Sequence, residues 1–319
     1  MNALPAPGQD PLPAWPGQRR RVGQFDLYVR AAGLGEPAVF VHGLGGSSTN
    51  WTDLMALLGD RLEGLAPDLP GHGRSPASPD GRYSLRVHAD AVEALIDDWG
   101  RGPVHLFGNS LGGAVTTLLA GRRPDLVRSL TLISPAFPQL DPRQAADTRV
   151  AALLLPGVER LARKRLAQVP VEQRTRAVLE LCYFDVSRVH QQRLAEEAAE
   201  AKARMDQPHA EVAFIRSLRG LIWSYLRLGR WSLWRSAGSV TAPVQLIWGE
   251  HDKLVPVLLA PRVQRAFARA AGGAQLTVFD QAGHVAQMEL PERTAELVAA
   301  RLDGAQAVPA PIDASGQPV

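Results

Sequence analysis

Residues 104–121, VHLFGNSLGGAVTTLLAG, decide the fold predicted for this chain of 319 residues. A short apolar run meets the glycine-rich turn GNSLGG, and apolar residues then recur at helical spacing. This order predicts a strand, a sharp turn and a helix, with Ser110 at the apex of the turn. Gly108 and Gly112 leave room where strand and helix crowd together. A serine held in this way is a candidate nucleophile, provided that a base lies beside it.

Short apolar runs alternate with helical patterns on both sides of this turn. The alternation predicts an α/β fold, with a mostly parallel central sheet that is covered by helices on both faces. Residues 20–31 alternate in hydrophobicity, which predicts one or two antiparallel strands opening the sheet. The other strands are expected at 38–41, 62–67, 104–107, 127–134, 244–248 and 275–279.

Helix boundaries follow from capping residues and periodicity. Ser84 is the expected N-cap of a helix that ends before Gly100, and Asn50 is the expected cap of a helix starting near residue 51. Two later helices are expected at 260–271 and 291–302.

The alternation breaks between residues 135 and 238, where helical patterns rich in arginine, glutamate and alanine replace the strands. This pattern predicts a helical insert in a core made of residues 20–134 and 239–303. Residues 1–19 read as a flexible, proline-rich arm, and residues 304–319 as a disordered tail.

Composition excludes several classes of protein. The net charge is only +3 and no block of like charges occurs, so nucleic-acid binding has no support. The lone cysteine, Cys182, excludes an internal disulfide and indicates no metal site. The chain contains no secretory signal and no stretch of eighteen apolar residues, so we expect a soluble cytoplasmic protein without a transmembrane helix.

A nucleophilic serine needs a base, and the base needs an acid that orients it. In α/β sheets such groups lie in loops beyond the carboxyl ends of strands. Asp252 and His284 each follow a late strand and are the candidate acid and base, with Glu250 as a neighbouring rival for the acid. His42 and His72 are expected to organise loops rather than to catalyse.

Five motifs together resemble the α/β-hydrolase fold superfamily. They are HGLGGSS at 42–48, DLPGHGRS at 68–75, GNSLGG at 108–113, WGEHDKLVP at 248–256 and AGH at 282–284. The resemblance covers roughly residues 22–303. It implies that the insert at 135–238 is a cap over the active site, with Ser110 as nucleophile, Asp252 as acid and His284 as base.

Attack by serine creates a negatively charged oxygen, which must meet preorganised donors. The backbone N–H of Leu111, at the start of a helix, points the right way. The resemblance implies that the backbone N–H of Leu44 is the second donor and that Gly43 permits close approach. Gly43 and Asn109 are expected to contact substrate, and no metal or cofactor is expected to be needed.

The expected activity is hydrolysis of a carboxylic ester of a small or medium, largely apolar substrate through an acyl-enzyme. Epoxide hydrolases and haloalkane dehalogenases of this superfamily carry aspartate at the elbow, so Ser110 disfavours those activities. Thioester hydrolysis stays open. So does carbon–carbon bond hydrolysis of a ring-fission product, since GNSLGG is similar to the GNSMGG of those enzymes. HGLGGSS and Val285 depart from that group, and a non-catalytic ligand receptor is a further alternative.

The end of the insert is both aromatic and basic. An amphipathic segment of this kind can contact a membrane surface or a lipid-like substrate. Alternatively, its aromatic rings can pack on the core. In both cases we expect apolar residues to cover the active site. The sequence does not indicate an oligomeric state. The segment is residues 221–234, LIWSYLRLGRWSLW, with Trp223, Tyr225, Trp231, Trp234, Arg227 and Arg230.

Overall fold

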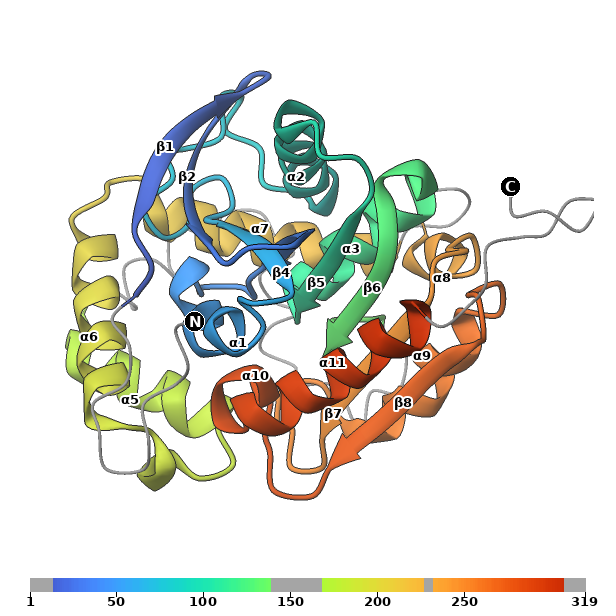
Figure 1. Cartoon of the computed structure of the whole chain (residues 1–319). Coiled ribbons are helices and arrows are strands. Elements are labelled where there is room, and N and C mark those ends of the chain that lie inside the picture. Colours follow the sequence, from blue (N-terminus) through green and yellow to red (C-terminus); the bar gives the residue numbers. More distant parts are fainter. Residues whose placement is uncertain (1–13, 139–167, 227–231, 307–319) are drawn as a thin grey trace, which may run out of the picture.

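The computed structural model describes residues 14–138, 168–226 and 232–306 (Figure 1). An eight-stranded sheet in the order β1-β2-β4-β3-β5-β6-β7-β8 forms its centre. β1 and β2 run antiparallel to their neighbours, whereas β3 to β8 are parallel. The strands are Gly17–Val22 (β1), Phe25–Ala32 (β2), Glu36–Val41 (β3), Leu62–Pro67 (β4), Val104–Asn109 (β5), Val127–Ile133 (β6), Val244–Gly249 (β7) and Ala274–Phe279 (β8).

The predicted fold class is confirmed. Each expected strand is present, and the first two form the antiparallel hairpin that the alternation at 20–31 predicted. β1 begins at Gly17, three residues before the expected start of the core at residue 20. β5 is buried along its whole length because helices cover both faces of the sheet, which explains its continuous apolar run.

Helices form a layer on each face of the sheet (Figure 1). The layers are α2 (Leu85–Trp99), α3 (Leu111–Arg122), α8 (Leu233–Ala237) and α9 (Ala260–Ala266) on one face, and α1 (Thr52–Leu57), α10 (Ala286–Glu289) and α11 (Pro291–Gln306) on the other. Between β6 and β7 the chain forms α5 (Val171–Cys182), α6 (Gln191–Met205) and α7 (Ala210–Tyr225).

Local capping rules succeeded for α2 and failed for α1. The Ser84 hydroxyl accepts the Val87 N–H, and Gly100 ends α2 in a left-handed conformation at φ 66°. Asn50 does not cap α1. It lies inside a short 3-10 helix, Ser48–Trp51, which Ser47 caps instead, and the side-chain Oδ1 of Asn50 accepts the Ser47 N–H.

Two predicted helix ends were also wrong. α9 ends at Ala266, five residues early, because the backbone turns at Phe267, whose ring is buried in the core. α11 runs to Gln306, four residues past its expected end.

α6 contacts the core through charged and polar side chains. Glu200 forms ion pairs with Arg30 at 3.4 Å and with Arg74 at 2.9 Å, which lie on β2 and on the loop after β4. Arg193 makes two hydrogen bonds to the carboxylate of Asp53. These contacts join the segment between β6 and β7 to the same end of the sheet at which the parallel strands finish. Residues 139–167 and 227–231 of the expected insert, 1–13 of the arm and 307–319 of the tail lie outside the described residues.

Candidate active site

Ser110 occupies the predicted turn between β5 and α3. Its backbone lies at φ 53° and ψ −116°, a conformation that side-chain-bearing residues rarely adopt and that must be held by its surroundings. Its N–H donates to the Ile133 carbonyl, and its own carbonyl accepts the N–H of Ala136. A Cβ at position 112 would lie 2.1 Å from the Val41 carbonyl oxygen, so only glycine fits there. The turn is therefore fixed by both neighbouring parallel strands.

Asp252 and His284 meet at the ends of β7 and β8. His284 Nδ1 lies 2.9 Å from Asp252 Oδ2, and both side chains are buried. The other carboxylate oxygen accepts the N–H groups of Leu254 and Val255, each at 2.8 Å. Burial by itself would raise the pKa of Asp252, but His284 and these hydrogen bonds outweigh burial and lower it. The carboxylate therefore stays ionised at neutral pH and can fix the imidazole with its proton on Nδ1.

Asn109 links the serine turn to the histidine loop. Its side-chain amide donates to the carbonyl of Ile133 and to that of His284, both at 3.0 Å. The side chain is buried, and both amide protons are used within the protein. These contacts favour a positioning role for Asn109 over the predicted contact with substrate.

The residues expected to supply backbone donors lie against Ser110. A Cβ at Gly43 would be 3.2 Å from Ser110 Cβ, so the loop after β3 passes close to the serine. Leu44 follows Gly43 directly, and Leu111 starts α3. Within the described part of the chain neither the Leu44 nor the Leu111 N–H has a hydrogen-bond acceptor. Two N–H groups in the residues that directly follow Gly43 and Ser110 thus have no acceptor within the described residues.

Sequence reasoning missed Glu289, which joins the histidine loop to the end of α5. Its carboxylate accepts the N–H of Gly283 at 2.7 Å and that of Phe184 at 2.8 Å. The His284 N–H donates to the Cys182 carbonyl at 2.7 Å, next to this bridge. Burial raises the pKa of Glu289, although both N–H donors oppose that change. No sequence pattern indicated this bridge, because Phe184 and Glu289 are 105 residues apart in the chain.

Replacing Glu289 with Ala is expected to lower the free energy of unfolding by about 2 kcal/mol, because two backbone N–H groups lose their acceptor. Urea denaturation measures this loss. Glu292→Ala is the matched control, since Glu292 is an exposed carboxylate in the first turn of α11. Equal stability of the two variants would contradict the bridging role.

Buried polar groups organise the loops after β3 and β4, as expected for His42. Asp68 accepts the Ser48 N–H at 2.6 Å and the Arg74 N–H at 2.7 Å. His42 Nε2 accepts the Leu69 N–H at 3.0 Å, which leaves the proton on Nδ1. His42 therefore holds two loops together and cannot also act as a base.

Three buried histidines form a row, in which the ring of His72 lies between those of His42 and His88. His88 Nε2 also lies 2.9 Å from the Ser217 hydroxyl of α7. Burial lowers the pKa of His42 to about 4 and that of His72 to about 3. Below pH 6.5 the unfolded chain therefore takes up protons that the folded chain refuses, and stability is lost as the pH falls.

His72→Asn is expected to reduce the loss of folding stability at low pH. The asparagine amide can still donate to the Pro70 carbonyl, as His72 Nδ1 does, but it does not titrate. Between pH 6.5 and 4 the wild type should lose on the order of 3 kcal/mol more than the variant, measured by urea denaturation at each pH. His190→Asn is the control, because His190 is exposed and asparagine can also cap α6. If the free energy of unfolding of the His72→Asn variant fell with pH as steeply as that of the wild type, His72 would not be the source of the acid sensitivity.

Some aromatic side chains at the end of the insert pack on the core, and others lie at the surface. Tyr225 and Trp234 pack on the core, with the Trp234 ring centroid 4.9 Å from that of Phe137. Trp223, in contrast, is 48% exposed. Core packing is therefore confirmed for two rings and was wrong for the third. Trp231, Arg227 and Arg230 lie outside the described residues.

The described ranges contain no group of three or more His, Cys, Asp or Glu side chains that could hold a metal ion. None of the helices that the structure describes has both the length and the apolar character needed to cross a bilayer.

Comparison with known proteins gives concordant matches. A family model described as alpha/beta hydrolase fold matches residues 37–291. An uncharacterized protein of Mycobacterium tuberculosis is 31% identical over 288 residues, covering 90% of this chain and 81% of that protein. The monoacylglycerol lipase of Rattus norvegicus is 28% identical over 279 residues, covering 86% and 78%. A solved haloalkane dehalogenase loop variant from Bradyrhizobium elkanii shares the fold, with a TM-score of 0.75, 23% identity and coverage of 92% and 97%.

Proposed function

The chain belongs to the α/β-hydrolase fold family, and from this premise we propose that it hydrolyses carboxylic esters of small or medium, largely apolar substrates. One observation carries the proposal. The hydrogen-bonded pair of Asp252 and His284 lies at the same sheet end as the strained Ser110 turn, and Asn109 ties the two loops together. This is the set of groups that nucleophilic acyl transfer requires.

In the proposed mechanism Ser110 Oγ attacks the ester carbonyl carbon while His284 Nε2 takes its proton. Asp252 keeps the histidine proton on Nδ1 and stabilises the imidazolium that forms. The N–H groups of Leu44 and Leu111 donate to the tetrahedral oxyanion. The histidine then protonates the leaving alcohol, and water activated by His284 releases the acid from the acyl-enzyme.

The choice of an ester rests on the nucleophile and on one relative. Ser110 stands where dehalogenases of this superfamily are expected to carry aspartate, so the fold shared with the dehalogenase does not extend to its chemistry. The rat relative is a monoacylglycerol lipase, a name that denotes action on an ester. We further propose that the described residues of the insert, 168–226 and 232–238, belong to a cap over this site. The ion pairs of Glu200 with the core support that arrangement.

A panel of p-nitrophenyl esters with acyl chains of two to twelve carbons tests the activity directly. Labelling with a fluorophosphonate, followed by peptide mass spectrometry, tests whether Ser110 is the nucleophile. We expect turnover of one part of the panel and a phosphonyl adduct on Ser110. Absence of both turnover and adduct would overturn the proposal. Turnover of a dienone ring-fission product in preference to every ester would instead assign carbon–carbon bond hydrolysis.

A further inference from the structure

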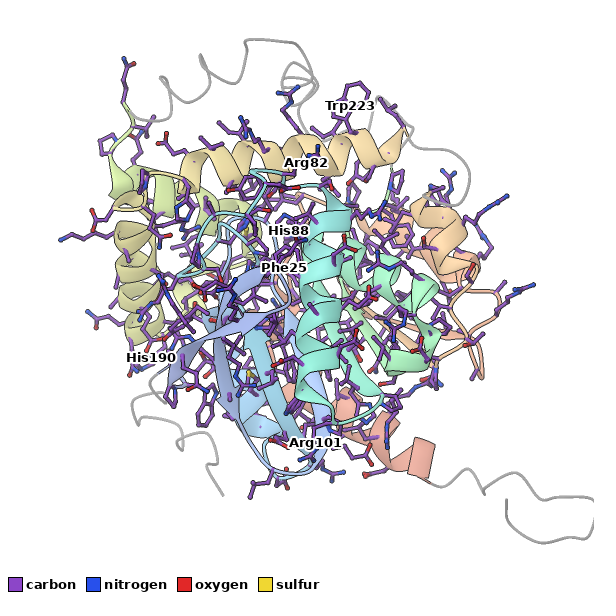
Figure 2. The ribbon with its side chains drawn as sticks, turned by 90° about the horizontal axis from the view of Figure 1, so that it is seen from above. Phe25, Arg82, His88, Arg101, His190 and Trp223 are labelled. Atoms are coloured by element: carbon purple, nitrogen blue, oxygen red, sulfur yellow. The ribbon has the colours of Figure 1, made fainter. Side chains whose placement is uncertain are left out.

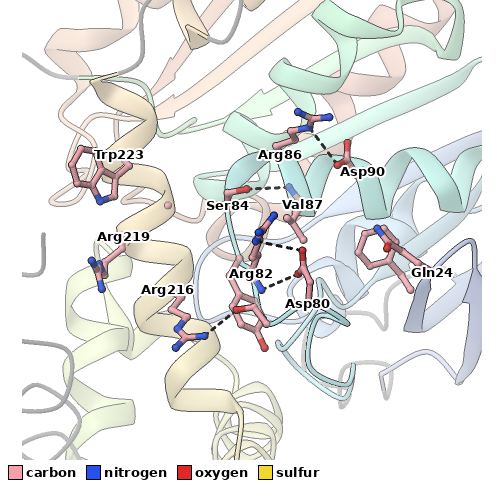
Figure 3. Close-up of a pocket in the computed structure, with 14 residues that line it drawn as sticks. Gln24, Asp80, Arg82, Ser84, Arg86, Val87, Asp90, Arg216, Arg219 and Trp223 are labelled. Carbon is pink, nitrogen blue, oxygen red and sulfur yellow. Dashed lines mark hydrogen bonds and ion pairs between the residues drawn. The ribbon is translucent and has the colours of Figure 1, made fainter. Parts of the chain in front are cut away.

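A hollow lies on the outer surface, between α7 and the segment that leads into α2 (Figure 3). Its volume is about 820 Å³, and neither Ser110, Asp252 nor His284 lines it. Four arginines and two aspartates line it, which gives a surplus of two positive charges. The charged lining residues are Arg82, Arg86, Arg216, Arg219, Asp80 and Asp90.

The two aspartates are occupied by neighbouring groups. Asp80 accepts the Arg82 N–H at 2.9 Å and lies 3.8 Å from the Arg82 side chain. Asp90 forms ion pairs with Arg86 at 3.7 Å and with Arg122 at 2.6 Å. These ion pairs offset the charges of Arg82 and Arg86, and Arg216 donates to the Gly81 carbonyl, an uncharged acceptor, at 3.0 Å. The side chains that line the hollow therefore keep their surplus of two positive charges.

Helix α7 turns one stripe inward and another outward. The inward stripe consists of Ala210, Ala213, Ser217, Leu221 and Ser224, which are all buried. The outward stripe follows the same spacing of three and four residues and consists of Arg216, Arg219, Trp223 and Leu226, the last directly after the helix. The outward stripe thus joins two arginines to two large apolar side chains.

The apolar part of this stripe faces water. Trp223 is 48% exposed and Leu226 is 59% exposed. Figure 2 shows Trp223 at the outer edge of the molecule, near the end of α7. A smaller hollow of about 200 Å³ lies beside the first and shares Trp223 with it, and its lining includes Leu85, Leu118 and Leu233. Arginines and exposed apolar surface are therefore contiguous.

We propose that this face of α7 and the start of α2 dock on a membrane surface that contains anionic phospholipids. Arginine guanidinium groups match phosphate oxygens in charge and geometry, and basic residues near an anionic leaflet are attracted to it. Tryptophan prefers the boundary between headgroups and acyl chains, so Trp223 and Leu226 enter that layer while the arginines remain among the headgroups. The inference goes beyond ester hydrolysis and does not depend on it.

Vesicle sedimentation tests the docking. The full chain is mixed with vesicles of phosphatidylcholine alone, or of phosphatidylcholine and phosphatidylglycerol in equal parts, at low and at high salt. We expect partitioning onto the anionic vesicles to be at least tenfold stronger and to weaken with salt. The double variant Arg216→Gln with Arg219→Gln is expected to lose about tenfold or more of that partitioning, since each arginine contributes about fivefold.

A matched control removes the same charge elsewhere. Arg265 and Arg269 are exposed, lie on or just after α9 and line neither hollow, so their double glutamine variant should bind nearly as well as the wild type. Trp223→Ser should lower partitioning severalfold and remove part of the fluorescence quenching by brominated lipid. Unchanged hydrolysis of p-nitrophenyl acetate by the Arg216 and Arg219 variant would show that its fold is intact.

Three results would overturn the docking proposal. They are equal partitioning onto both kinds of vesicle, an equal loss in the two arginine double variants, and binding of lysophosphatidylglycerol monomers without binding to vesicles. The last would make the hollow a pocket for free amphiphiles. Ser110→Ala protein should still bind vesicles, so failure of the hydrolase proposal and failure of the docking proposal are distinguishable.

Discussion

Ser110→Ala is expected to lower kcat for the best p-nitrophenyl ester by about 10⁴ to 10⁶-fold, because the hydroxyl that forms the acyl-enzyme is removed. Catalysis that remains should come from the Leu44 and Leu111 N–H groups and from substrate binding alone. KM should change little, since the serine adds little to ground-state binding. Steady-state kinetics of purified wild type and variant measure both quantities.

Trace wild-type contamination is the main confounder of such a large loss, so the variant should also be tested for the fluorophosphonate adduct. Ser134→Ala is a comparison for the adduct alone, because Ser134 is another buried serine with positive φ, at 44°, after the neighbouring strand, and its side chain lies beside Asp252. We expect Ser134→Ala to retain the adduct and Ser110→Ala to lose it. A Ser110 variant with more than a tenth of wild-type kcat would rule out this residue as nucleophile.

Asp252→Asn is expected to lower kcat by about 10⁴-fold while leaving the fold in place. An asparagine amide would donate to His284 Nδ1, which would move the histidine proton to Nε2 and block removal of the Ser110 proton. The variant should also lose the part of the acid sensitivity of folding that Asp252 contributes. The pKa of Asp252 is lowered in the fold, so its stabilising contribution exists above the ordinary aspartate pKa and is lost as the pH falls through the lowered value.

Glu250→Gln is the matched control for the acid. Glu250 lies two residues before Asp252 and its side chain is exposed. The kcat of the Glu250→Gln variant and its stability below pH 4 should therefore match those of the wild type. Kinetics at pH 7.5 and urea denaturation from pH 2.5 to 6 test both statements. A larger loss in the Glu250 variant than in the Asp252 variant would reverse the assignment of the acid.

Sequence patterns identified those parts of the molecule that short-range physics controls. The apolar runs gave every strand from β3 to β8, and Ser84 and Gly100 gave the bounds of α2. The glycine spacing around Ser110 gave the turn, because a Cβ at Gly108 would lie 2.6 Å from the carbonyl oxygen of Gly112, only four residues along the chain. Asn50 failed as a cap because Ser47 competes for the same role three residues earlier.

The chain by itself therefore determined the fold class, the strained serine turn and the candidate residues of the site. Tertiary structure alone decided which of these residues meet. Asp252 rather than Glu250 reaches His284, Asn109 binds the His284 carbonyl across 175 residues of sequence, and Glu289 bridges to Phe184. It also decided that Trp223 faces water while Tyr225 packs on the core. The physical reason is that strands, turns and caps depend on neighbours within a few residues, whereas these contacts depend on the order in which the strands join the sheet.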